Sequence, residues 1–173
     1  MVIEIHTKVS VGDSYGQKLG NLTLEDAKFF GRPNFRGEED QFKDARAKFT
    51  VLIPNDVADQ LRDLGWNVKT TCPTAEQEKE GMECISHLKV MVDVEKCDVW
   101  IIMGEDREKL EAKNLGVIDK SRIEEMDMEI RAWMYNVDEV RTGTEEPRYS
   151  ARLVTLVANI KPNLLSAKYG NLV

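Results

Sequence analysis

Basic and aromatic side chains in alternating positions are the strongest chemical signal in this sequence. Arg131, Trp133 and Tyr135 are spaced two residues apart, so a β-strand would project all three from one face. Positive side chains neutralise the phosphates of a nucleic acid, and flat rings stack on unpaired bases of any sequence. The pattern therefore predicts a surface that binds a single nucleic-acid strand. Other predicted strand faces and one polar loop supply the remaining candidates, which are Arg32, Phe35, Arg36, Arg46, Lys48, Lys89 and Arg152.

A plainer interpretation of the same residues stays open at this point. Lys and Arg are common on the outer face of a sheet simply because they keep it soluble. Trp133 and Tyr135 could cover a second hydrophobic cluster instead of contacting a ligand. Trp66 and Trp100 are expected in the core rather than in a binding site.

Catalytic and metal chemistry have little support. The chain has two histidines, His6 and His87, and no GxSxG, HExxH or GxxxxGK[ST] motif, nor a GxGxxG that opens a helix. One acidic cluster could in principle hold a divalent cation, although clustered carboxylates on turns and strand faces are usually just solvated. Its members are Glu124, Glu125, Asp127 and Glu129. We therefore expect no enzyme activity, no metal and no other cofactor.

Strands are needed to present the basic and aromatic residues, and most of the chain alternates with a period of two. The clearest example runs from Ala45 to Ile53, where apolar and polar side chains alternate until Pro54 ends the pattern. Further alternating or short apolar stretches predict strands at 3–5, 22–30, 66–72, 84–94, 98–103, 128–134 and 151–160.

A single short helix is predicted between these strands. It follows Pro54, with Asn55 or Asp56 as its cap, and ends at Gly65. The stretches 31–44 and 74–83 read as polar loops, and 105–125 could hold one or two helical turns. About eight strands joined by turn-rich loops predict a mostly β fold, an antiparallel OB-type barrel with extra strands and one short α-helix. We expect residues 1–173 to form a single OB-like domain, with 162–173 as an apolar C-terminal tail.

Composition and charge narrow the class of protein. The 173 residues contain no apolar run near the roughly 20 residues of a membrane-spanning helix, and the first residues lack the features of a secretory signal. Cys72, Cys84 and Cys97 form no CxxC pair, so we expect free thiols in a reducing compartment. The net charge of −7 excludes a broadly basic binder but allows a local basic surface.

Four stretches of the sequence resemble a known group of proteins. They are LEDAKFFGRPNFRG, LRDLGWNVKTTCP, GVIDKSRIEEMDMEIRAWMYNV and ARLVTLVANIKPNLLSAKYG, which together span roughly residues 20 to 170. The group consists of small proteins of tailed bacteriophages and prophages, some of them regarded as single-stranded DNA-binding proteins with an OB-type barrel. The resemblance points to Asn34, Phe35 and Gly37 in the loop, and to Arg131, Trp133 and Tyr135 on a strand.

The resemblance implies a single-stranded DNA-binding protein of a phage replication or recombination module, largely indifferent to sequence and located in the host cytoplasm. Replication or recombination proteins are its candidate partners, and no membrane is involved. Proteins of this kind commonly end in an acidic tail that recruits such partners, whereas no acidic residue follows Glu146 here. The alternative is a phage-encoded structural or host-directed protein-interaction module without nucleic-acid binding, which the acidic net charge favours.

The apolar tail leads to a first prediction. Burial of one leucine stabilises by about 1.5–3 kcal/mol, so Leu164, Leu165 and Leu172 should hold this segment on a surface. If that surface belongs to a second copy, truncation after Lys161 should convert a homo-oligomer to a monomer in light scattering. If it belongs to the same chain, truncation should lower thermal stability only. Random-coil NMR signals from the intact tail would contradict both outcomes.

Overall fold

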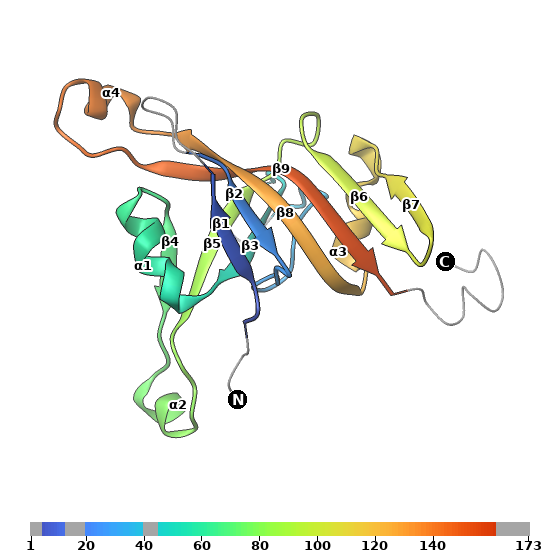
Figure 1. Ribbon diagram of the computed structural model, residues 1–173, viewed down its shortest axis with the longest axis horizontal. Helices are drawn as coiled ribbons and strands as arrows, with labels where there is room; N and C mark the ends of the chain where they lie inside the picture. The colour runs from blue at the N-terminus through green and yellow to red at the C-terminus, as the bar shows by residue number, and fades with distance from the viewer. Residues whose placement is uncertain (1–4, 13–19, 40–44, 162–173) are drawn as a thin grey trace.

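The computed structural model describes residues 5–12, 20–39 and 45–161, and within these ranges the chain is mostly β-structure (Figure 1). The strands are β1 (Lys8–Val11), β2 (Leu22–Glu25), β3 (Lys48–Ile53), β4 (Val68–Thr71), β5 (Ile85–Met91), β6 (Asp98–Met103), β7 (Asp106–Lys109), β8 (Ile123–Met134) and β9 (Tyr149–Ile160). The helices are α1 (Asn55–Asp63), α2 (Ala75–Lys79), α3 (Val117–Lys120), α4 (Val137–Arg141) and the 3-10 helix η1 (Ala112–Asn114). The predicted tail 162–173 and most of the predicted strand 3–5 lie outside the described residues.

All nine strands belong to one sheet with the order β1-β2-β8-β9-β5-β3, in which β4 adds to β5, and β6 and β7 extend from β9. The segment that follows β2 then lies beside β3, the last strand of this order. Phe29 bridges to Val51, and the Phe30 N–H donates to the Thr50 carbonyl at 2.8 Å. The sheet is therefore curled, with β3 and β5 behind β1 and β2 in Figure 1. The buried hydrophobic residues that the structure describes form one cluster inside the curl.

The mostly β prediction is confirmed, whereas a wholly antiparallel sheet is not found. β9 pairs in parallel with both β5 and β6, because it leaves the hairpin with β8 in the direction in which those two strands run. The strand predicted at 98–103 matches β6, and the strand expected at 22–30 is only four residues long as β2.

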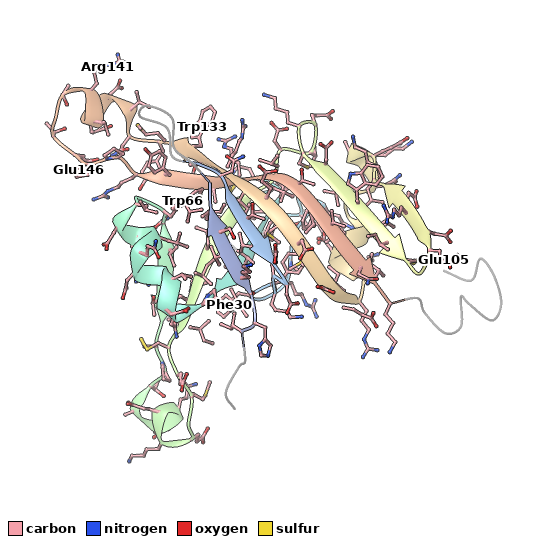
Figure 2. The ribbon with its side chains drawn as sticks, viewed as in Figure 1. Phe30, Trp66, Glu105, Trp133, Arg141 and Glu146 are labelled. Atoms are coloured by element: carbon pink, nitrogen blue, oxygen red, sulfur yellow. A yellow bond between two sulfur atoms is a disulfide. The ribbon has the colours of Figure 1, made fainter. Side chains whose placement is uncertain are left out.

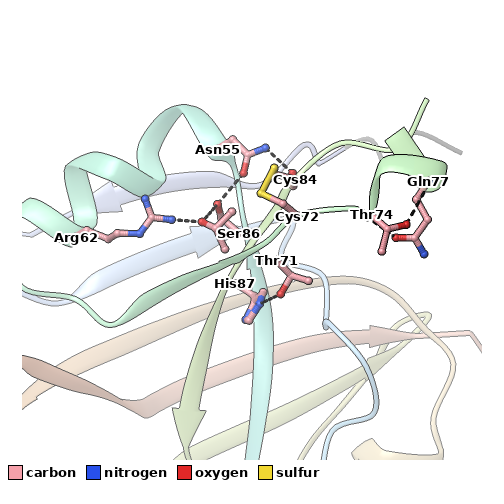
Figure 3. The surroundings of a disulfide bond; sticks show 10 residues. Asn55, Arg62, Thr71, Cys72, Thr74, Gln77, Cys84, Ser86 and His87 are labelled. Carbon is pink, nitrogen blue, oxygen red and sulfur yellow. Dashed lines mark hydrogen bonds between the residues drawn. A yellow bond between two sulfur atoms is a disulfide. The ribbon is translucent and has the colours of Figure 1, made fainter. Parts of the chain in front are cut away.

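The predicted single helix is present, and η1 and α3 lie within 105–125, where one or two helical turns were expected, whereas α2 and α4 were missed. α1 ends at Asp63, and the predicted stop Gly65 follows shortly after with a φ of +106°. Its cap was predicted wrongly: Pro54 holds that position with no side-chain cap, and the Asn55 amide donates to the Cys84 carbonyl at 2.8 Å (Figure 3). α2 lies in a predicted loop and begins with a capping box between Thr74 and Gln77. The three-residue spacing of a capping box can be recognised in a sequence. The five-residue helix has no buried apolar face, however, so its sequence did not indicate a helix.

The prediction for the cysteines is wrong for two of the three. Cys72 and Cys84 form a disulfide, and Cys97 is the free cysteine (Figure 3). The antiparallel register of β4 and β5 ends at the pair Thr71 and Ile85, so the next pair brings the two cysteines face to face. Sequence spacing gave no indication of that register. Burial raises the pKa of the Cys97 thiol.

The prediction of burial is confirmed for one of two tryptophans and wrong for the other. Trp66 is 2% exposed and packs in the core as predicted, whereas Trp100 on β6 is 38% exposed, so its assignment to the core is wrong. β6 presents Val99 and Ile101 inward, which turns Trp100 outward by strand alternation. Among the described residues, no helix has the length and apolar character needed to cross a membrane.

The loop after β2 is fixed to α3 by hydrogen bonds to one carboxylate. The Phe35 and Arg36 backbone N–H groups donate to Asp119 at 2.7 and 3.1 Å. Asn34 and Glu38 exchange two further hydrogen bonds across the turn, and Gly37 adopts a φ of +72°. These hydrogen bonds therefore hold the loop and α3 together, although the two segments are far apart in sequence.

This anchoring predicts a specific loss of stability. Asp119→Ala removes both acceptors and leaves the half-buried Phe35 N–H without a partner, which should lower the free energy of unfolding by about 1–3 kcal/mol. Urea denaturation measures the change. Asp106→Ala, at an exposed position on β7, is the control and should change it by less than about 0.5 kcal/mol. Equal effects of the two substitutions would show that Asp119 does not anchor the loop.

Candidate nucleic-acid interface

The outer face of β8 changes its charge partway along the strand. Asp127 and Glu129 project from one half of this face, and Arg131 and Trp133 project from the other. The change coincides with a shift in the register between β8 and β9 at Glu129 and Ile130. One strand therefore presents an acidic half and a basic, aromatic half to solvent.

The register shift also determines the direction of Arg152. On β9, Ala151 and Leu153 are buried before the shift, and Leu156 and Ala158 are buried after it, because Val154 is an extra residue in the ladder. Strict alternation back from Leu156 would place Arg152 in the core. The bulge instead leaves Arg152 on the outer face, opposite Arg131.

Four strands contribute to one row of side chains on this outer face. Lys48 of β3 is paired with Met91 of β5, Met91 with Arg152 of β9, and Arg152 with Arg131 of β8. Three cationic residues thus lie across neighbouring strands, on either side of one methionine. Such a row can follow the phosphates of an extended strand.

Trp133 lies beside the arginines of this row, near the base of the hairpin that carries α4 (Figure 2). The Arg152 guanidinium carbon is 4.4 Å from the centroid of the Trp133 ring, and that of Arg131 is 5.9 Å from it. The side chain remains 48% exposed, so part of the ring is open to a ligand. The Nε atom of Arg152 is buried without a hydrogen-bond partner in the described structure.

A groove of about 470 Å³ begins at this row. Three arginines from separate segments line it, namely Arg36, Arg46 and Arg152, and Met91 forms part of its wall. Arg36 reaches it because the loop is anchored on Asp119 and because Gly116 leaves room for the arginine stem. A Cβ at Gly116 would lie 2.5 Å from the Arg36 Cγ.

Tyr135 lies further along the hairpin and is 53% exposed. Its N–H donates to the Arg148 carbonyl at 3.2 Å. Next to it, the buried Asn136 side chain donates to the Glu146 carbonyl and accepts from the Arg148 N–H, both at 2.9 Å. These bonds give the hairpin a fixed base, which orients Tyr135.

The structure brings most of the predicted residues together, with one clear correction. Arg36, Arg46 and Arg152 share the groove, Lys48 and Arg131 share the row, and Lys89 projects from the same face of β5. Arg32 is exposed in the loop after β2 and does not line the groove. The predicted role of Phe35 is wrong, because its ring is 2% exposed and stacks on Phe49 in the core at 5.3 Å.

Sequence reasoning missed an aromatic pair on the same sheet. From the sequence, His87 has no predicted role in binding, yet its ring stacks on Phe30 with centroids 4.6 Å apart and planes 6° apart. Burial, together with the neighbouring Lys69, lowers the pKa of His87, which favours a neutral ring near pH 7. No sequence signal relates Phe30 to β5, because the contact depends on the return of the chain after β2 to β3.

Two carboxylates of the acidic cluster that could in principle hold a cation have hydrogen-bond partners in the fold. Asp127 accepts the Asp26 N–H at 2.9 Å, and Glu129 accepts the Asn21 amide at 2.9 Å. These two carboxylates therefore help to hold the β2 region. Across the described ranges, no three metal-ligating side chains come together.

Comparisons with known proteins identify the family and the fold of this chain. The family model for a phage ssDNA-binding domain matches residues 13–172. The single-stranded DNA-binding protein from bacteriophage Enc34, solved in complex with ssDNA, is similar in structure, with a TM-score of 0.50 at 14% identity over 90% of this chain and 97% of that chain. At this identity the likeness concerns the fold alone.

Two other structures of the Enc34 protein have a TM-score of 0.45 at 13% identity. The C-terminal truncation is matched over 90% of this chain and 97% of that chain, and the other over 96% of each. A search of curated proteins finds no match.

The family match extends from residue 13 to residue 172 and so includes β2, the anchored loop and the whole β8–β9 hairpin. The resemblance inferred from the sequence is thereby confirmed, and the chain belongs to the family of phage ssDNA-binding domains.

Proposed function

We propose that this protein binds single-stranded DNA, largely without sequence preference, across the outer face of β3, β5, β9 and β8. The observation that carries the proposal is the row from Lys48 to Arg131, with Trp133 beside it. The cationic side chains of the row and of the adjoining groove neutralise phosphates, and Trp133 and Tyr135 stack on bases. No bond is made or broken, and the role is to protect and organise the strand.

A single strand suits this surface better than a duplex. Base stacking on Trp133 needs a base whose face is free, and paired bases have theirs covered by neighbours. The basic area is also local, since the acidic half of β8 lies on the same face of the sheet. A long, straight duplex would meet those carboxylates, whereas a flexible single strand can stay on the basic half.

The same proposal includes an OB-type barrel. Its five strands would be β2 with its continuation to Phe30, β3, β5, β9 and β8, joined in that ring by the pairings and by the bridge between Phe29 and Val51. β1, β4, β6 and β7 would be additions to it. OB folds bind oligonucleotides on a strand face bordered by loops, which fits the positions of the anchored loop and the α4 hairpin.

Family membership supports a place in phage DNA replication or recombination, in the host cytoplasm, with proteins of those processes as partners. The test of the core proposal is a fluorescence titration with a mixed-sequence oligonucleotide and its duplex form. Preferential binding of the single strand is expected. Absence of binding to both, with binding to a host or phage protein instead, would favour the protein-interaction alternative.

Salt dependence gives one quantitative prediction. The logarithm of the association constant should fall linearly with the logarithm of salt concentration, by about 0.7 per phosphate neutralised. Arg131→Gln should reduce the magnitude of the slope by about 0.7, because one phosphate contact is lost. Lys109→Gln is the matched control, because Lys109 pairs with Asp98 at the far edge of the sheet. Identical slopes for all three proteins would place the phosphate contacts elsewhere.

Base stacking gives another prediction. Trp133→Ala should weaken binding of single-stranded DNA by about 1–3 kcal/mol, the value of one base on an aromatic ring. Thermal stability should change little, because the side chain is about half exposed. Trp100→Ala removes another exposed tryptophan, on β6, and should leave affinity unaltered. A steep drop in melting temperature for Trp133→Ala would assign that ring to the packing of the fold.

A further inference from the structure

A stacked pair of rings lies on the same sheet as the proposed binding row but is not one of its members. Phe30 and His87 stack with centroids 4.6 Å apart and planes 6° apart. Phe30 is 36% exposed, which is unusual for a phenylalanine that belongs to the core. We propose that this pair is a second base-stacking platform, so that the DNA strand continues along β5 from Trp133 to Phe30. This inference rests on the proposed function above.

Both rings are held in place by the surrounding strands. The Phe30 N–H donates to the Thr50 carbonyl on β3 at 2.8 Å, which fixes the backbone of Phe30 beside that strand. The His87 Nε2 atom is 2.9 Å from the Thr71 hydroxyl on β4 (Figure 3). A ring whose orientation is already fixed loses little conformational entropy when a base stacks on it.

The pair lies at a useful distance from the row. Met91 belongs to the row and His87 lies four residues earlier on β5, which corresponds to about 13 Å at 3.3 Å per residue. Figure 2 likewise shows Trp133 and Phe30 well apart. The two platforms are therefore separate and could receive different bases of one strand.

The charged side chains on the outer face of the three strands along this path are all basic. The outer face of β3, β4 and β5 follows from their alternation and register, and all three strands are fully described. Lys89 lies on it between the row and His87, and Lys69 is paired with His87 from β4. Within these three strands this face has no acidic residue, in contrast to the acidic half of β8. Its members are Lys48, Thr50, Leu52, Lys69, Thr71, Ile85, His87, Lys89 and Met91.

A purely structural role would have another consequence. Leu52 is paired with His87 and is only 5% exposed, so the two rings could simply shield it from water. In that case, loss of the Phe30 ring would lower stability, and any loss of DNA affinity would be the same for every oligonucleotide length. Affinity and stability must therefore be measured on the same variants.

The experiment compares Phe30→Leu, Phe30→Trp and the control Trp100→Ala by titration with oligonucleotides of about 4 to 16 nucleotides, the range bound by one OB fold. Phe30→Leu keeps apolar cover over the sheet but has no flat ring. It should weaken binding of the longest oligonucleotide by about 5- to 100-fold. The shortest should be affected less, because it can occupy the Trp133 end, where two arginines flank the ring. Phe30→Trp should retain affinity, and Trp100→Ala should have no effect.

Other results would overturn the inference in distinguishable ways. Unchanged affinity of Phe30→Leu for every length, while Trp133→Ala still weakens binding, would reject the second platform alone. An equal loss at all lengths, accompanied by a lower melting temperature, would assign the pair a structural role. Failure of the unmodified protein to bind any single strand would instead reject the proposed function itself.

Discussion

The ladder between β8 and β9 is the constraint on which the rest of the molecule depends. These are the two longest strands, with twelve residues each. β2, β5 and β6 pair with them directly, and the other strands join the sheet through these three. The bulge at Val154 divides β9 into two parts. The part before it pairs with β5 and presents Arg152, and the part after it pairs with β6. One extra residue thus separates the barrel-like half from the extension and sets the direction of the basic row.

Hydrogen bonds to a few polar groups, rather than apolar packing, position the segments around the row. Asp119 binds two backbone N–H groups of the loop that carries Arg36, and Asn136 holds the base of the hairpin beside Tyr135. Loops have little apolar surface to bury, and their backbone groups need partners. Directional bonds satisfy that need and fix the geometry as well. The ring of Phe35 adds a large apolar contact by stacking on Phe49, which explains its burial.

The charge distribution reconciles an acidic protein with an anionic ligand. A net charge of −7 acts at long range and is screened by salt, whereas the row and groove act at contact distance. The carboxylates Asp127 and Glu129 disfavour a nucleic acid on the other half of β8. In the proposed binding mode they would restrict the DNA strand to the basic half. Net charge alone would have favoured a protein partner.

Sequence by itself determined several of the strands, the main helix and part of the row. Alternation identified β3 and β6, the glycine at position 65 marked the end of α1, and the spacing of Arg131 and Trp133 placed both on one outer face. Alternation describes the two faces of one strand, but it says nothing of which strands become neighbours or in what register. Only the tertiary structure decided the parallel pairing of β9, the disulfide of Cys72 with Cys84, and the stack of Phe30 on His87. Each of these depends on contacts between segments far apart in the chain or on a local register, and neither is encoded in the period of a single strand.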